Sequence, residues 1–183
     1  MSEPQPDALL GREPFALFGL EPHFSIDLDA ARERYRDLQR IAHPDRHSAA
    51  DPTQRRLAAQ LAADINSAWN TLKDPVARAR HLLELRGIDS ARFNSAQVPP
   101  AILMEQMELR EALETAVSEA DPLAAIDRLL GRLRTQQQRA GERLQTALTH
   151  DDLDTALAGV QEMQFLARLQ EEALRREETL DTD

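Results

Sequence analysis

The stretch Ala42-His43-Pro44-Asp45-Arg46 separates two segments that both have the apolar spacing of an amphipathic helix. Apolar side chains recur at steps of three and four on both sides of it; they are Leu28, Ala31, Tyr35, Leu38 and Ala42, then Leu57, Leu61, Ile65, Ala68 and Leu72. Proline lacks a backbone N–H and disfavours the α conformation in the preceding residue, so Pro44 predicts the end of the first helix. The sequence therefore predicts an antiparallel helical hairpin with His43 and Asp45 at its solvent-facing tip.

Short flanking helices are predicted on both sides of this hairpin. Residues 14–20 form a compact apolar cluster with too few polar residues to stand alone, so we expect one short helix packed on the hairpin. Ser25 or Asp27 can cap the helix before the tip by accepting a backbone N–H. A further helix is expected over residues 76–83, and Gly87 is a suitable residue to end it.

The second half of the chain has a different composition and predicts a helical bundle. Residues 1–86 hold 12 basic and 13 acidic residues, whereas residues 87–183 hold 10 and 19. Three helical patterns cover residues 100–119, 123–148 and 152–176, and short breaks between long helices favour antiparallel neighbours. We therefore predict an all-α protein with an N-terminal domain over 1–86, a linker over 87–98 and an antiparallel three-helix bundle over 99–183. Residues 177–183 are expected to be disordered.

Composition excludes several function classes. A net charge of −10 argues against nucleic-acid binding, and no apolar run approaches the roughly 20 residues that span a bilayer. We expect no signal peptide, because the first residues lack a basic patch and a long apolar run. The chain has no cysteine, which excludes disulfides and cysteine-ligated metals and is compatible with a cytoplasmic location.

No pattern in the chain predicts catalysis or a cofactor. It lacks a nucleophile elbow, a phosphate-binding glycine loop and a zinc signature. His43 and His47 are four residues apart, which could clamp a metal on a helix, but Pro44 disfavours a regular helix there and no third ligand is suitably spaced. We therefore expect no enzyme activity, no metal and no cofactor.

Arginines form a basic stripe on the helix before the tip. Arg32, Arg36 and Arg40 recur at steps of four, and Arg46 follows the tip. This stripe can steer a partner with an acidic surface. The alternative is an ordinary solvated helix face.

Residues 102–113 predict a helix with two apolar faces. At about 100° per residue, Ile102, Leu109, Leu113 and Ala116 share a core face. The other large apolar residues, Leu103, Met104 and Met107, lie on a second face that is edged by Glu108 and Glu111. Methionine suits adaptable contact surfaces. The alternative is that a bundle helix touches two neighbours, so the whole apolar arc is buried.

The last helix also has apolar residues on two different faces. Its predicted core face is formed by Ala156, Val160, Met163, Ala167 and Leu174. Phe165 and Leu169 point away from that face.

The tip and its neighbours resemble the J-domain of DnaJ-type co-chaperones. The resemblance rests on His43-Pro44-Asp45 between two amphipathic helices, followed by Ile65-Asn66-Ser67-Ala68-Trp69 and Leu72-Lys73-Asp74-Pro75. The string Leu103-Met-Glu-Gln-Met-Glu-Leu-Arg-Glu111, with Gln164-Phe165-Leu166, is similar to the C-terminal domain of the HscB family of iron–sulfur co-chaperones. This likeness extends over nearly the whole chain.

The resemblance implies two partners and two sets of contact residues. The DnaK-class chaperone HscA would meet the tip and the basic stripe, with Asp45 facing a chaperone arginine and His43 setting the tip; the set is His43, Pro44, Asp45, Arg32, Arg36, Arg40 and Arg46. The scaffold protein IscU would meet Leu103, Met104, Met107, Glu108, Glu111 and Phe165. A monomer is expected, because the spare apolar surface then has a use. The alternatives are a J-domain co-chaperone for a different client and a structural adaptor with a vestigial tip.

Overall fold

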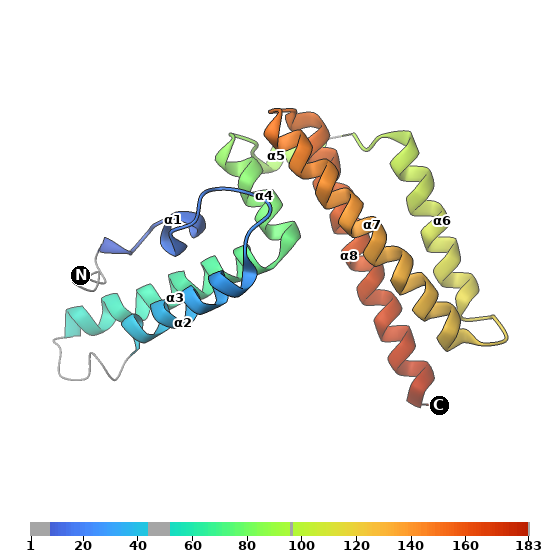
Figure 1. The fold of residues 1–183 in the computed structure, drawn as a ribbon, viewed down its shortest axis with the longest axis horizontal. Helices are drawn as coiled ribbons and strands as arrows, with labels where there is room; N and C mark the ends of the chain where they lie inside the picture. The colour runs from blue at the N-terminus through green and yellow to red at the C-terminus, as the bar shows by residue number, and fades with distance from the viewer. Residues whose placement is uncertain (1–7, 44–51, 96, 183) are drawn as a thin grey trace. The chain divides into compact units, whose positions relative to one another are not determined.

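Helices are the only regular secondary structure in the described part of the chain. A computed structural model describes residues 8–43, 52–95 and 97–182, and no strand occurs in these ranges. The helices are α1 (Pro14–Phe18), α2 (Leu28–Ala42), α3 (Pro52–Lys73), α4 (Pro75–Leu85), α5 (Ser90–Ser95), α6 (Pro100–Ala116), α7 (Pro122–Thr149) and α8 (Leu153–Thr182). They belong to two compact units, Met1–Leu82 and Leu83–Asp183 (Figure 1). The predicted all-α class, a helical hairpin with short flanking helices plus a three-helix bundle, is confirmed.

The ends of α2 are set by local chemistry. The Asp27 carboxylate accepts hydrogen bonds from the backbone N–H groups of Asp29 and Ala30, both at 3.0 Å, so Asp27 and not Ser25 is the N-cap. The helix ends at Ala42, and His43 has an extended backbone with φ −62° and ψ 131°. This is the conformation predicted for the residue before Pro44.

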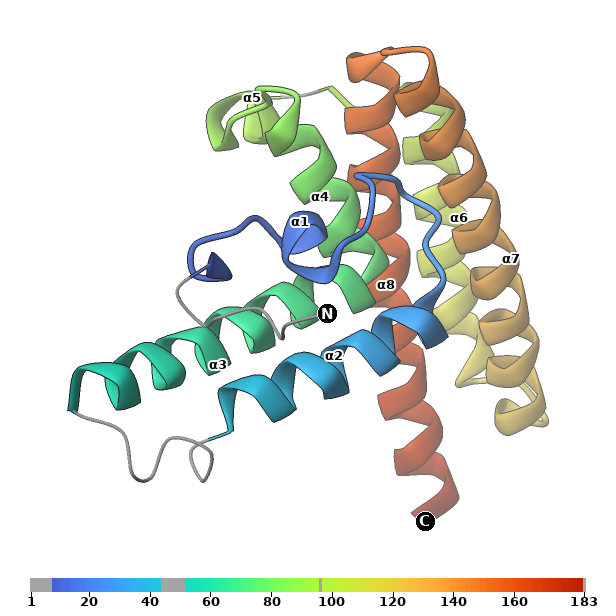
Figure 2. The same cartoon turned by 60° about the vertical axis from the view of Figure 1, so that its left-hand side comes forward.

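The first unit is built on the predicted hairpin. Figures 1 and 2 show α2 and α3 lying side by side. The fully buried large side chains of this unit come from α1, α2, α3 and α4; they include Phe15, Leu17, Leu38, Leu61, Ile65, Leu72 and Leu82. The short helix α1 contacts both hairpin helices, which confirms its predicted packing.

Arg78 is a buried cation near the start of α4. Its Nε donates a hydrogen bond to the Phe24 carbonyl at 2.7 Å, and its guanidinium also donates to the Leu72 carbonyl. The guanidinium carbon lies 5.2 Å from the centroid of the Phe24 ring. Burial lowers the pKa of Arg78 from its ordinary value, and the nearby carboxylate of Asp74 partly opposes that effect. Arg78 thus connects α4 to the end of α3 and to the loop before α2.

Replacing Arg78 by Ala is expected to destabilise the first unit by about 2–4 kcal/mol, because two buried carbonyls lose a charged donor. Urea unfolding followed by the fluorescence of Trp69, the single tryptophan of the chain, measures this effect in the unit that contains it. The exposed Arg55→Ala on α3 is the control and should stay within about 0.5 kcal/mol of the unchanged chain. Equal midpoints for the two variants would contradict the assigned role.

The second unit is a three-helix bundle with a defined register. Hydrogen bonds join Gln137 to Gln170 and Arg143 to Glu162, so residue numbers rise along α7 as they fall along α8. The core includes apolar side chains of all three helices; they include Leu109, Leu113, Ile126, Leu130, Leu133, Leu144, Val160, Leu166 and Leu169. The antiparallel pair α7–α8 lies side by side in both views, and α6 contacts both helices (Figures 1 and 2).

The segment predicted as a linker contains a helix. Gly87 ends α4 with φ +82°, a conformation that glycine adopts without a Cβ clash, and the Ile88 N–H donates to the Leu83 carbonyl at 3.0 Å. Ile88 and Phe93 are buried, and α5 follows at Ser90–Ser95. Its Arg92 pairs with Asp154 of α8 at 2.9 Å. The turn-forming residues after α4 therefore separate two helices, and the predicted linker over 87–98 is not an extended segment throughout.

The prediction that α8 ends near residue 176 before a disordered tail is wrong. The helix continues to Thr182, since residues 177–182 contain no glycine or proline and begin with two helix-forming glutamates. Ion pairs support the turn before this extension, with Arg175 on Glu171 at 3.1 Å and Arg176 on Glu172 at 2.8 Å.

The predicted core face of α8 is only partly correct. Ala156, Val160 and Met163 are buried, but Ala167 and Leu174 are exposed and Leu169 is fully buried. The reason is that different neighbours cover the two halves of α8. α5 contacts the first half through the Arg92–Asp154 ion pair and a hydrogen bond from Gln161 to the Phe93 carbonyl. The second half lies beside both α6 and α7.

The loop between α7 and α8 is a tight cap. Asp151 has φ +56°, and the Asp152 carboxylate accepts a hydrogen bond from the Thr155 N–H at 3.1 Å. The Thr155 side chain and, to a smaller extent, this backbone N–H stabilise the charged carboxylate by hydrogen bonding, which lowers the pKa of Asp152. The predicted break between these helices is confirmed.

None of the helices in the described ranges has a stretch that is both long and apolar enough to cross a lipid bilayer.

Candidate functional site

The basic stripe on α2 is exposed, and its three charges differ in their pairing. Arg32 pairs with Asp29 at 2.7 Å, and Arg40 pairs with Asp37. Arg36 forms no ion pair or side-chain hydrogen bond with another described residue. Its charge is therefore the least compensated and the most available to a partner.

His43 directly follows this stripe. The structure places it as the exposed C-cap of α2, with the extended backbone described above. The other predicted tip residues, Pro44, Asp45 and Arg46, lie outside the described residues. The structure thus brings together His43 and the α2 arginines, and the grouping of the remaining tip residues with them stays a prediction.

A polar network that the sequence did not indicate joins the two hairpin helices beside the stripe. The side-chain carbonyl of Asn66 accepts hydrogen bonds from the Tyr35 hydroxyl at 2.8 Å and from Gln39 Nε2 at 2.7 Å. The Tyr35 ring also stacks on Trp69, with ring centroids 5.3 Å apart. These contacts hold α2 in register with α3. The only sequence signal was the four-residue step from Tyr35 to Gln39.

The second candidate site is the outer face of α6. The side chains of Leu103, Met104 and Met107 are 46%, 64% and 73% exposed. Glu108 and Glu111 are also exposed and form no ion pair with another described residue. The predicted second apolar face is therefore present on the surface, and the alternative of a completely buried arc is wrong for these side chains.

The register of α6 against α8 places Phe165 near this face. Arg110 pairs with Glu172 at 2.7 Å, and Arg176 donates to the Leu113 carbonyl, so the two helices run parallel with an offset of 62 or 63 residues. That offset puts Phe165, which is half-buried on α8, level with Leu103. Residues from two helices thus lie at the same height of the bundle.

Exposed leucine and methionine side chains with an acidic edge form a surface suited to another protein. Methionine adapts its shape to a partner, and contiguous exposed apolar side chains are typical of interaction sites. In the part of the chain that the structure describes, no three His, Asp or Glu side chains are grouped so that they could hold a metal ion.

Residues 98–174 match the family described as the HSCB C-terminal oligomerisation domain. A co-chaperone protein HscB homolog from Ralstonia nicotianae is 40% identical over 168 residues, which cover 91% of this chain and 95% of the relative. A homolog from Paraburkholderia phymatum is 40% identical over 95% of this chain and 99% of its own length.

Two solved structures of HscB proteins have the same fold as this chain. The chaperone HscB from Vibrio cholerae superposes with a TM-score of 0.81 at 37% identity, covering 92% of this chain and 99% of that one. The human co-chaperone protein HscB superposes with a TM-score of 0.80 at 25% identity, covering 91% and 83%.

A helical hairpin with a basic stripe, together with a bundle that exposes an apolar face, defines a J-domain co-chaperone that works by contacting other proteins. The chain belongs to the HscB family, whose members act as co-chaperones in iron–sulfur cluster assembly.

Proposed function

We propose that this chain binds the scaffold protein IscU through the outer face of α6 and stimulates the ATPase of HscA through its His-Pro-Asp tip. The observation that carries the proposal is the exposure of Leu103, Met104 and Met107, three neighbouring large apolar side chains on α6. Family membership supports the choice of partners. The basic stripe on α2 and the extended backbone at His43 support the contact with the chaperone.

The coupling of these two contacts needs no reaction chemistry in this chain. One protein that holds the client and the ATPase together raises their effective concentration, to about the millimolar range for short connections. The iron–sulfur cluster is cargo of the client, so the chain itself needs no catalytic site. We infer further that it acts in the cytoplasm as a monomer. The cysteine-free sequence is compatible with a reducing compartment.

The test is the ATPase rate of HscA measured alone, with this chain, with IscU and with both. We expect the chain to raise the rate by itself and the combination to exceed the sum of the separate effects, because the chain then delivers a client to an activated chaperone. No stimulation by the chain would contradict the proposal. Stimulation that IscU neither binds nor increases would indicate a different client.

A further inference from the structure

The face of α7 next to α6 carries a second arginine stripe. Arg128, Arg132, Arg139 and Arg143 fall within about 60° of one another at 100° per residue. They are four of the ten basic residues in an otherwise acidic half of the chain.

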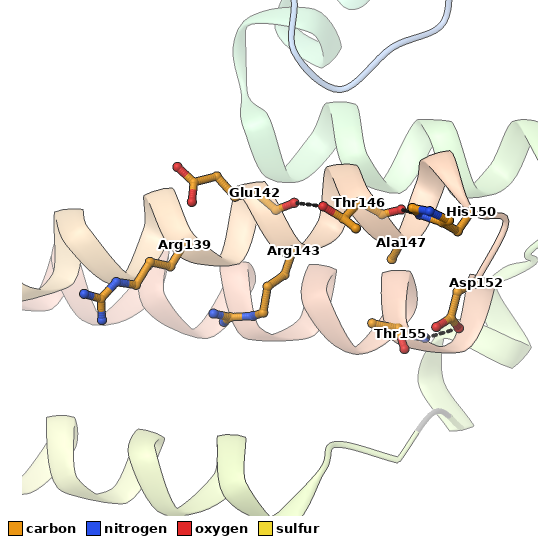
Figure 3. A pocket seen from close by; sticks show the side chains of 8 residues that line it. All are labelled: Arg139, Glu142, Arg143, Thr146, Ala147, His150, Asp152 and Thr155. Atoms are coloured by element: carbon orange, nitrogen blue, oxygen red, sulfur yellow. Dashed lines mark hydrogen bonds between the residues drawn. The ribbon is translucent and has the colours of Figure 1, made fainter.

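Three hollows follow this stripe and share its side chains. A hollow of about 490 Å³ between α6 and α7 is lined by Arg132, which also lines a second hollow of about 370 Å³. Arg139 lines the second hollow and a third of about 520 Å³, which reaches His150 and the start of α8. In Figure 3 the guanidinium groups of Arg139 and Arg143 point to the same side of α7, and Glu142 points to the other. We call this row of three neighbouring hollows the α7 trough; the helix length from Arg128 to His150 is about 33 Å.

The centre of the α7 trough contains two arginines that lack an ion-pair partner among the described residues, although Glu108 and Glu111 line the first hollow with Arg132. At its ends, Arg128 pairs with Glu119 at 2.8 Å and Arg143 pairs with the buried Glu162 at 2.5 Å. Arg132 and Arg139 form no ion pair or side-chain hydrogen bond with any described residue. Both line the second hollow, whose lining contains no acidic side chain.

The floor of this central hollow lacks a side chain at Gly131. A Cβ added there would meet no atom within 4 Å, so packing inside the bundle does not require glycine. Glycine in a helix interior costs about 1 kcal/mol relative to alanine. The glycine leaves the hollow open to an approaching segment.

The α7 trough borders the candidate client surface on α6. Glu108 and Glu111 belong to that surface and also line the first hollow. The Gln136 side chain donates to Glu105, which sets the antiparallel register of α7 and α6. One turn further along α7, Arg139 is therefore level with the start of the exposed apolar face.

We propose that the α7 trough is a second contact for the client bound on α6, and that an acidic side chain of the client lies between Arg132 and Arg139. This inference rests on the proposed function, because the client of the α6 face is its occupant. Arginine pairs strongly with carboxylates through two parallel hydrogen bonds, and a charged rim increases the association rate. Apolar contacts on α6 then supply affinity, and the arginines select a client segment with Asp or Glu at this position.

The test uses the full chain and IscU as the probe, with the dissociation constant measured by calorimetry at low and high salt. The double variant Arg132→Glu and Arg139→Glu should weaken binding by about tenfold or more at low salt and should reduce the salt dependence. Arg134→Glu is the matched control, because Arg134 is an exposed arginine of the same helix that lines none of the three hollows. It should change the dissociation constant by less than about twofold.

A second variant keeps both charges and fills the hollow. Gly131→Leu should weaken IscU binding while the melting temperature stays equal or rises, because leucine is a better helix former than glycine. The proposal is overturned if the double arginine variant binds IscU as tightly as Arg134→Glu does. If Met107→Asp still loses binding in that case, the α6 contact stands and only the trough contact is wrong. Absence of binding by the unchanged chain would overturn both.

Discussion

Asp45→Asn is expected to abolish stimulation of the HscA ATPase while leaving the chain folded. The resemblance to J-domains has Asp45 facing an arginine of the chaperone. Loss of one member of a charge pair at an interface leaves the other charge unpaired, which costs about 2–5 kcal/mol. The stimulation at a given concentration should therefore fall by about 30-fold or more. His43→Gln should have the same direction, because His43 is exposed and ends α2 at the tip.

The measurement is the steady-state rate of phosphate release by HscA over a titration of this chain. Asp127→Asn is the matched control, since it removes one carboxylate from an exposed position of α7 and should stimulate normally. Trp69 fluorescence checks that the first unit remains folded. Normal stimulation by Asp45→Asn would refute the assignment of the tip.

The triple variant Leu103→Ala, Met104→Ala and Met107→Ala is expected to lose IscU binding without losing stability. These side chains are 46%, 64% and 73% exposed, so the core keeps its packing, and alanine is the best helix former. Truncating the centre of an interface typically costs 2 kcal/mol or more, and about 3 kcal/mol for the three side chains corresponds to roughly 100-fold weaker binding.

Calorimetric titration of IscU into the variant gives the change in affinity, and the melting temperature of the variant gives its stability. Leu174→Ala is the control, because Leu174 is 37% exposed on α8 but lies about 180° around the helix from Phe165. Full affinity of the triple variant would show that the α6 face does not hold this client. Phe165→Ala is a poorer test, since Phe165 is half-buried and its loss also disturbs packing.

Helix ends were predicted well where one residue type acts through its own backbone. Asp27 caps α2, and Gly87 ends α4 with a positive φ. His43, the residue before Pro44, has the extended backbone that a following proline favours. The division of α6 into two apolar faces was also predictable, because 3.6-residue periodicity separates Met107 from Leu109. Whether the second face is exposed was left open, since a bundle helix can touch two neighbours.

Features that depend on which helix lies beside which were not predictable in this way. The segment after Gly87 contains turn-forming residues, yet Ile88 and Phe93 are buried. Leu169 is in the core and Leu174 is not, and α6 lies beside the second half of α8, which contains both residues.

Local sequence was sufficient for the hairpin helices, for the three bundle helices apart from the end of α8, for the cap at Asp27 and for the two faces of α6, since each depends on interactions within a few residues of the chain. The register of the bundle helices decided which residues of different helices lie beside one another. It places Phe165 level with Leu103 through the Arg110–Glu172 pair, and it aligns Arg132 and Arg139 with the α6 face. Pairing across helices decides which charges are compensated, and no periodicity within a single helix contains that information.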